Sequence, residues 1–207
     1  MYRWMQWDGT GRERRWINPQ VHTIYYFRQY ISYGGFARSD TNQQIENLKK
    51  KPGSSDSELY YKRKAIRQFA EDLTGLFQPT NLPYCLTWIP PSKTETDARY
   101  DNRLEKVVRH ASKSMRIAHP IKTFICHTSR EPLHHGGLRD PSAIASSISW
   151  TNCNLALYSS VVVVDDVLTT GASFRAVHDL IKNQYPKMHV IGVVWALAID
   201  NPGDEDL

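Results

Sequence analysis

The sequence predicts an α/β fold, with a mainly parallel twisted sheet flanked by helices and a helical, aromatic N-terminal extension. From residue 84 onward, short apolar runs alternate with segments of helical periodicity. Strands that are apolar on both faces are typical of parallel sheets covered by helices. Before residue 80 the chain is basic and rich in aromatic residues. We therefore divide it into a hood or extension, residues 1–80, and an α/β core, residues 81–207.

The core elements alternate along the chain. They are a strand at Tyr84–Ile89, a helix marked by Leu104, Val107, Val108, Ala111 and Met115, strands at Ile121–His127 and Val161–Val164, a helix marked by Phe174, Val177, Leu180 and Ile181, and a strand at Val190–Ala198. In the extension, apolar residues from Leu59 to Phe77 recur at helical spacing. Val21–Tyr33 is a second candidate helix. Parallel sheets bind ligands at the carboxyl ends of their strands, so the chemistry is expected there.

Composition excludes several classes of protein. Hydrophobic residues make up 41% of the 207 residues, which is enough for a folded core. No apolar run approaches the roughly 20 residues that span a bilayer, and the first residues lack the apolar stretch of a signal peptide. The three cysteines form no CxxC pair, which argues against a zinc ribbon or a disulfide framework. We expect a cytoplasmic protein with reduced thiols.

The positive charge is concentrated in the extension. Residues 1–80 hold 13 Lys and Arg against 8 Asp and Glu, whereas residues 81–207 hold 13 Lys and Arg against 13 Asp and Glu. This excess indicates either a nucleic-acid or acidic partner or a solvated basic surface. The segment Arg12–Arg15, with its flanking tryptophans, leaves the same choice between stacking on nucleic acid and forming a local core.

The segment Asp165–Ser173 follows a run of four valines and precedes a helix. Two carboxylates at the end of an apolar strand are costly unless they face solvent, a ligand or a cation. The hydroxyls and the small residues that come next stand at a helix start, where free N–H groups favour an anion. The segment suits a sugar phosphate. An ordinary polar turn with Thr170 or Ser173 as N-cap is the alternative, but the complete pattern favours the ligand site.

VVVVDDVLTTGAS resembles the phosphoribosyl-pyrophosphate signature of type I phosphoribosyltransferases, and the resemblance extends over about residues 83–200. IPPSKTETDARYDNRL is similar to the pyrophosphate loop of the ComF-like branch, and SREPLHHGGLRDPSAI lies where that branch has a mobile loop. The chain departs from ComF proteins because it lacks their N-terminal zinc ribbon. Residues 1–80 resemble no family that we can name.

The resemblance implies that a nucleophile displaces pyrophosphate from C1 of the ribose, with Mg²⁺ neutralising the leaving group. Asp165 and Asp166 would be the catalytic residues, orienting the ribose hydroxyls and holding the metal through water. Arg130 and Arg139 would close over the substrate. The implied substrate-binding residues are Thr169, Thr170, Gly171, Ala172 and Ser173 for the phosphate, Ser92 and Lys93 for pyrophosphate, and Arg99 and Arg130, with Arg103 as a further candidate.

Two classes of function remain open. The first is an active phosphoribosyltransferase of nucleotide metabolism, with phosphoribosyl pyrophosphate or a nucleotide as its ligand. The second is a repurposed effector or nucleotide sensor, as in antiviral defence and retron systems, with a nucleic-acid or protein partner on its basic part. A ComF-like DNA-uptake accessory is a third, weaker interpretation.

His134 and His135 are weaker candidates for a base or a metal site. The acceptor and a homo-oligomeric state stay open.

Overall fold

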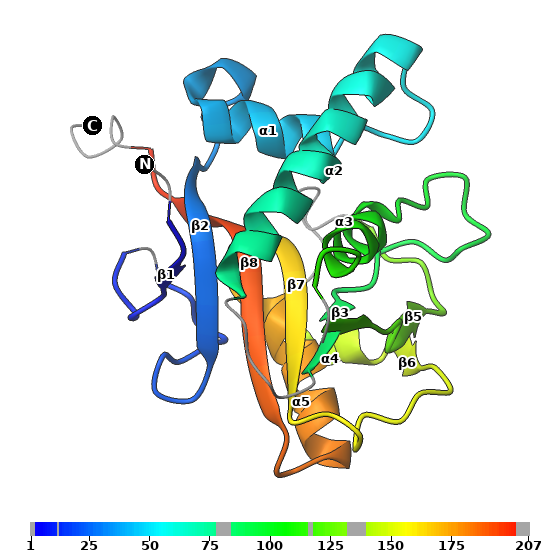
Figure 1. The fold of residues 1–207 in the computed structure, drawn as a ribbon. Helices are drawn as coiled ribbons and strands as arrows, with labels where there is room; N and C mark the ends of the chain where they lie inside the picture. Colours follow the sequence, from blue (N-terminus) through cyan, green and yellow to red (C-terminus); the bar gives the residue numbers. More distant parts are fainter. Residues whose placement is uncertain (1–2, 12, 78–83, 116–117, 132–139, 202–207) are drawn as a thin grey trace.

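The computed structural model describes residues 3–11, 13–77, 84–115, 118–131 and 140–201. A six-stranded sheet forms its centre (Figure 1). Five neighbouring strands run parallel, and one short edge strand is antiparallel. In spatial order the strands are β1 (Met5–Gln6), β2 (Thr23–Ile31), β8 (His189–Ile199), β7 (Ser160–Leu168), β3 (Tyr84–Trp88) and β4 (Ala118–Pro120).

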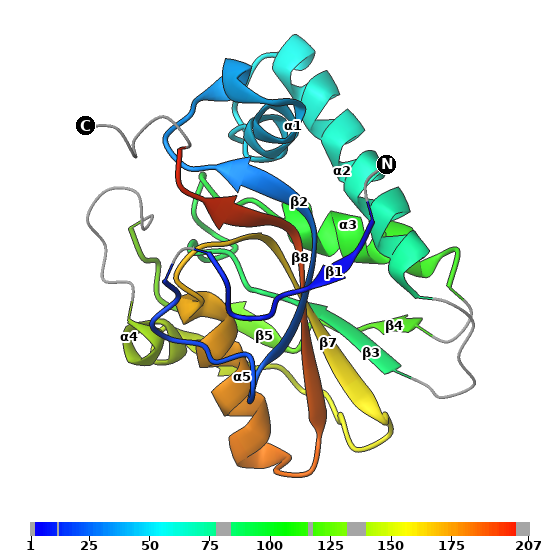
Figure 2. The same ribbon diagram turned by 90° about the vertical axis from the view of Figure 1, so that its left-hand side faces the viewer.

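Helices cover both faces of this sheet (Figure 2). One face carries α1 (Asp40–Leu48), α2 (Asp56–Leu76) and α3 (Arg103–Ser112), with the short 3-10 helix η1 (Phe36–Arg38) ahead of α1. The other face carries α4 (Pro141–Ala145) and α5 (Ala172–Gln184). The predicted α/β class, with a mainly parallel sheet between helices, is confirmed.

Burial explains why the central strands form. Val161–Val164 is buried throughout, because helices lie on both faces of β7. On the face of α1–α3, the indole of Trp195 in β8 stacks on the ring of Phe69 in α2, with centroids 4.8 Å apart. The helix α2 begins at Ser55, whose side chain forms a capping box with Glu58.

The candidate helix at Val21–Tyr33 is wrong, because this segment contains the strand β2. It pairs in parallel with β8 over its whole length, from Thr23 opposite Ile191 to Ile31 opposite Ile199. β-branched and aromatic residues dominate β2, and they favour strands. Residues 1–80 therefore supply an edge of the central sheet as well as two α-helices; the domain boundary at residue 80 stays a prediction.

The strand expected at Ile121–His127 is shorter and lies elsewhere. Only Phe124–Cys126 forms a strand, β5, and it pairs antiparallel with β6 (Ile148–Trp150) in a separate two-stranded sheet. The edge of the main sheet is instead formed by β4. No helix within the described ranges is both long and apolar enough to cross a membrane.

Candidate functional site

The strand order reverses direction between β3 and β7. From β3 the chain moves outward to β4 on one side, and it then returns to β7 on the other side and continues to β8. The helices α3 and α5, which follow β3 and β7, lie on opposite faces of the sheet (Figure 2). Ligands of open α/β sheets bind at such a switch point, beside the carboxyl ends of the strands. The candidate site therefore lies in the loops after β3 and β7.

The loop after β7 encloses a small hollow. It is lined by Asp165 and by Val167–Phe174, so all five loop residues expected to hold a phosphate lie around it. The helix α5 begins there without a side-chain cap, which leaves N–H groups of its first turn available to an anion. Among the residues that the structure describes, none offers the buried Oγ1 of Thr170 a hydrogen-bond partner. These features suit a phosphate-sized anion.

Gly171 is the N-cap of α5 and has a left-handed backbone, with φ of 83°. A β-carbon at this position would lie 2.7 Å from Cγ2 of Ile17. Glycine is therefore required both by the backbone conformation and by close packing. The contact also shows that the N-terminal segment covers this loop, which the sequence did not reveal.

The two aspartates lie within β7, not in the loop, and their side chains point to opposite faces, as successive residues of a strand do. Asp165 faces α5 and lines the hollow. Asp166 faces α3, where its Oδ2 accepts hydrogen bonds from Nε and Nη2 of Arg103 at 3.0 and 2.7 Å. Nζ of Lys49 lies 3.8 Å from the other oxygen of Asp166. The structure therefore separates the pair that was expected to act together.

The surroundings give the two carboxyl groups different proton affinities. Burial and the adjacent Asp166 carboxylate raise the pKa of Asp165 to about 7. Burial also acts to raise the pKa of Asp166, but the charges of Lys49 and Arg103 outweigh it and hold that pKa at about 2. At neutral pH Asp166 is thus an ionised partner of two cations. The charges of Arg103 and Lys49 also act to lower the pKa of Asp165, but among the described residues no Lys or Arg forms an ion pair with it, so its carboxyl group is available to a ligand.

Asp166 belongs to a larger buried network. Nη1 of Arg103 lies 2.9 Å from Oδ2 of Asp101, and Nζ of Lys62 in α2 donates to the same oxygen at 2.7 Å. Arg103, the further candidate for substrate binding, here joins the two carboxylates. Three cations and two carboxylates meet where α1, α2 and α3 approach β7.

The loop after β3 starts beside Asp165, since the N–H of Ile89 donates to the carbonyl of Val164. Here Lys93 is 5% exposed, and its Nζ lies 3.0 Å from Oε1 of Glu131. The N–H of Arg130 donates to the carbonyl of Ser92 at 2.7 Å.

Arg99 is mostly exposed and pairs with Asp97 and Glu131. Burial lowers the pKa of Arg130. The structure thus brings Ser92, Lys93, Arg99 and Arg130 together. Arg139, His134 and His135 lie outside the described residues.

A magnesium ion was implied by the resemblance, and the donor set supports it in part. Mg²⁺ is usually bound by one or two carboxylates together with substrate phosphates. Asp165 fits this chemistry because its carboxyl group lines the hollow and, within the part of the chain that the structure describes, forms no ion pair with Lys or Arg. Asp166 does not fit, because Arg103 and Lys49 already neutralise it.

Residues 137–206 match the family model of the phosphoribosyl transferase domain. The matched part contains α4, β6, β7, α5 and β8, and hence the aspartates and the loop with Gly171. This family consists of transferases for phosphoribosyl groups. None of the curated proteins matches the chain.

Proposed function

We propose that the chain binds phosphoribosyl pyrophosphate and Mg²⁺ and transfers ribose 5-phosphate to or from a base or other small acceptor. The match of residues 137–206 to the family model of the phosphoribosyl transferase domain supports this proposal. The observation that carries the proposal is the hollow after β7. It combines an uncapped helix start, the unpartnered hydroxyl of Thr170 and the carboxyl group of Asp165.

Each loop has a role in the proposal. The 5′-phosphate accepts hydrogen bonds from the first turn of α5 and from Thr170. The pyrophosphate lies at the loop after β3, where Lys93 pairs with it in place of Glu131. Asp165 accepts hydrogen bonds from the ribose hydroxyls and, through water, holds the metal. When bound, magnesium neutralises charge on the leaving pyrophosphate.

The two aspartates differ in their proposed roles. Asp165 touches the ligand, and its pKa falls when a cation approaches, because the ionised form is then stabilised. Asp166 is a positioning residue, since it binds Arg103 and thereby fixes α3 against β7. In this proposal, Asp165 is therefore the one aspartate of the pair that binds the ribose hydroxyls.

Calorimetric titration with phosphoribosyl pyrophosphate, with and without Mg²⁺, tests the binding. Thr170→Val keeps the shape of the side chain and removes its hydroxyl, so we expect roughly tenfold weaker binding for the loss of about 1.4 kcal/mol. Ser146→Ala, at an exposed serine after α4, is the matched control. Absence of binding by the unaltered chain would refute the proposal.

Transfer is tested separately, by pyrophosphate release over a panel of nucleobases and ammonia. We expect release with at least one acceptor, and Asp165→Asn should abolish it. Binding without release from any acceptor would contradict the transfer step and leave a ligand-binding module.

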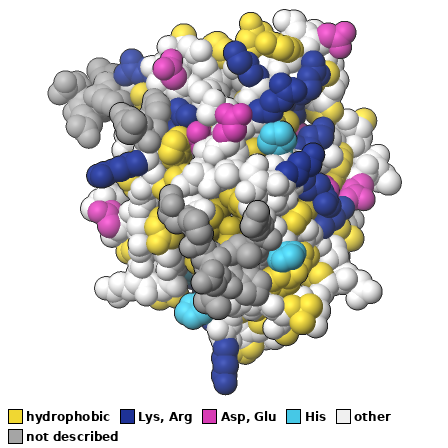
Figure 3. Space-filling view, in the orientation of Figure 1, with side chains coloured by type: hydrophobic (Ala, Val, Ile, Leu, Met, Phe, Trp, Pro, Cys, Tyr) yellow, Lys and Arg dark blue, Asp and Glu magenta, His cyan; other side chains and the backbone are white. Residues whose placement is uncertain are grey.

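The interpretation as an effector with a nucleic-acid or protein partner stays a prediction from charge. Lys and Arg gather on the side of the molecule formed by α2 and α3 (Figure 3), where Arg63, Lys64 and Lys106 are exposed. The aromatic segment near Arg12–Arg15 instead contributes to the core: Trp7 is buried, and Arg14 is buried and donates to the carbonyl of Ala198.

A further inference from the structure

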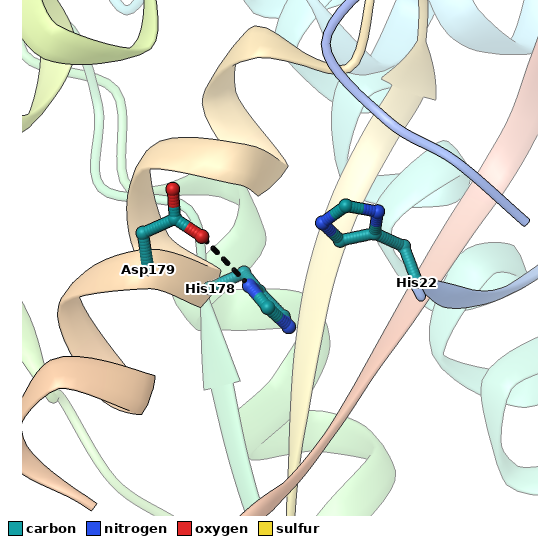
Figure 4. A group of neighbouring side chains, drawn as sticks. All are labelled: His22, His178 and Asp179. Atoms are coloured by element: carbon teal, nitrogen blue, oxygen red, sulfur yellow. Dashed lines mark hydrogen bonds and ion pairs between the residues drawn. The ribbon is translucent and has the colours of Figure 1, made fainter. Parts of the chain in front are cut away.

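Two histidines and a carboxylate meet on the α5 face of the sheet (Figure 4), and both imidazoles lie beside the ring of Phe174 in the first turn of α5. His178 and Asp179 are neighbours in α5, and His22 precedes β2. One ligand atom from each of the three residues lies within 4.8 Å of the others. His22 and His178 are 3% and 8% exposed, so the two imidazoles are shielded from water, whereas the Asp179 side chain is 42% exposed.

The pair on α5 has a separation suited to metal binding. Nδ1 of His178 lies 3.0 Å from Oδ1 of Asp179. Two ligands of a tetrahedral ion with bonds of about 2.0–2.1 Å lie roughly 3.3 Å apart. A divalent ion can therefore take the place of the proton between these two atoms with a small adjustment of the side chains.

His22 approaches this pair from the facing segment (Figure 4), with its ring centroid 4.7 Å from that of His178. Its Nδ1 accepts a hydrogen bond from the backbone N–H of Asn18 at 3.0 Å and also lies 3.1 Å from the carbonyl oxygen of Asn18. Metal binding at Nε2 selects the tautomer in which Nδ1 is protonated and donates to this carbonyl oxygen, and the hydrogen bond from the Asn18 N–H is then lost. Metal-bound histidines are commonly oriented in this way by a backbone carbonyl.

We propose that His22, His178 and Asp179 bind a divalent transition-metal ion of the zinc class, with water completing the coordination. Imidazole and carboxylate ligands in this number are typical of Zn²⁺ sites that keep a water ligand. Arg175 pairs with the second carboxylate oxygen, Oδ2 of Asp179, at 2.5 Å. This neighbouring positive charge weakens the attraction for a cation, so we expect a lower affinity than for the same ligands without it.

The ion would join two segments that are far apart in sequence. His22 follows the segment whose Ile17 packs on Gly171, and α5 begins at Gly171. Metal bound between His22 and α5 would hold this segment against the helix. It would thus stabilise the folded chain by mass action.

The test uses the full chain, stripped with EDTA, and Zn²⁺ alone as the probe. Calorimetry should give one equivalent bound, and the thermal midpoint should rise with Zn²⁺ concentration. Co²⁺ at the same site should show the visible absorption of a four- or five-coordinate ion. His22→Phe keeps an aromatic ring beside Phe174 and His178 and removes the ligand atom. It should keep its midpoint without metal and lose the response to zinc.

His110→Phe, at an exposed histidine in α3 on the opposite face, is the matched control and should respond like the unaltered chain. If His22→Phe does not fold, Asp179→Asn is the deciding variant, because it replaces an anionic ligand oxygen by a neutral amide and should bind zinc more weakly than the unaltered chain. A lack of zinc binding by the unaltered chain would overturn the proposal. So would an unchanged zinc response in both His22→Phe and Asp179→Asn.

Discussion

Arg103→Met removes the guanidinium that binds Asp166 and keeps most of the apolar stem of the side chain. In the folded protein Arg103 donates two hydrogen bonds to Asp166, at 3.0 and 2.7 Å, and the Asp166 side chain is 9% exposed. After the change, the remaining cation near this carboxylate within the described network is Lys49, whose Nζ lies 3.8 Å away. The variant therefore leaves a buried charge with weak compensation.

The expected cost follows from two considerations. The pKa of Asp166 is lowered from 3.8 to about 2. This lowering corresponds to a net stabilisation of the ionised form by roughly 2 kcal/mol, with the opposing effect of burial already included. Removing one partner of a buried ion pair typically costs about 3–5 kcal/mol, because the other charge stays desolvated. We expect Arg103→Met to lower the free energy of unfolding by about 3–5 kcal/mol at pH 7.

Urea denaturation, followed by tryptophan fluorescence, measures this loss. Arg109→Met is the matched control in the same helix, since Arg109 is exposed and pairs with Glu105; its cost should stay below about 1 kcal/mol. The double variant Arg103→Met/Asp166→Asn should recover part of the stability, because it removes the stranded charge.

The pH dependence provides a second readout. Asp166 has a folded pKa below its unfolded value, so its contribution to stability is present above about pH 4 and is lost as the pH falls toward 2. The difference between Arg103→Met and the unaltered chain should therefore shrink in acid. A loss smaller than about 1 kcal/mol at pH 7 would refute the view of Asp166 as an ion-paired positioning residue.

Three further predictions concern single side chains. Asp165 has a folded pKa of about 7, so the ligand-free protein should lose stability as pH rises from 4 to 7; Asp165→Asn should remove this slope in urea titrations at pH 5 and 8. Gly171→Ala should cost about 1–3 kcal/mol in thermal unfolding, whereas Gly53→Ala, at an open position, should be nearly neutral. Trp195→Phe removes the hydrogen bond from Nε1 to Asp72 and should cost about 1–3 kcal/mol by chemical denaturation.

The sequence predicted the central strand and its loop because the pattern there is local. Four buried valines identify β7, and Gly171 marks the start of α5. The sequence analysis did not predict that the side chains of the two aspartates point to opposite faces of the sheet, because it treated the segment from Asp165 onward as a loop. Since the strand continues to Leu168, alternation sends the two side chains to opposite faces.

Other features depend on partners remote in sequence, which a single sequence does not reveal. Arg103 stands 63 positions from Asp166, and nothing near it distinguishes it from a solvated helix residue. Thr23–Ile31 mixes aromatic and apolar residues in a way that fits either a helix or a strand; pairing with β8 decides between them. The β-branched and aromatic content of this segment was the available signal.

The pairing of β2 with β8 also bears on how the chain reaches its folded state. β2 is synthesised well before its partner strand, His189–Ile199, because most of the other strands and helices lie between them in the sequence. Until β8 is made, β2 lacks its parallel neighbour, and no strand connects β2 with β7 in the sheet. Contacts of such long sequence separation slow folding and leave strand edges exposed in the meantime. A chain that stops before residue 189 would lack β8, so the edges of β2 and β7 that pair with β8 would both be unpaired. We expect such a chain to aggregate.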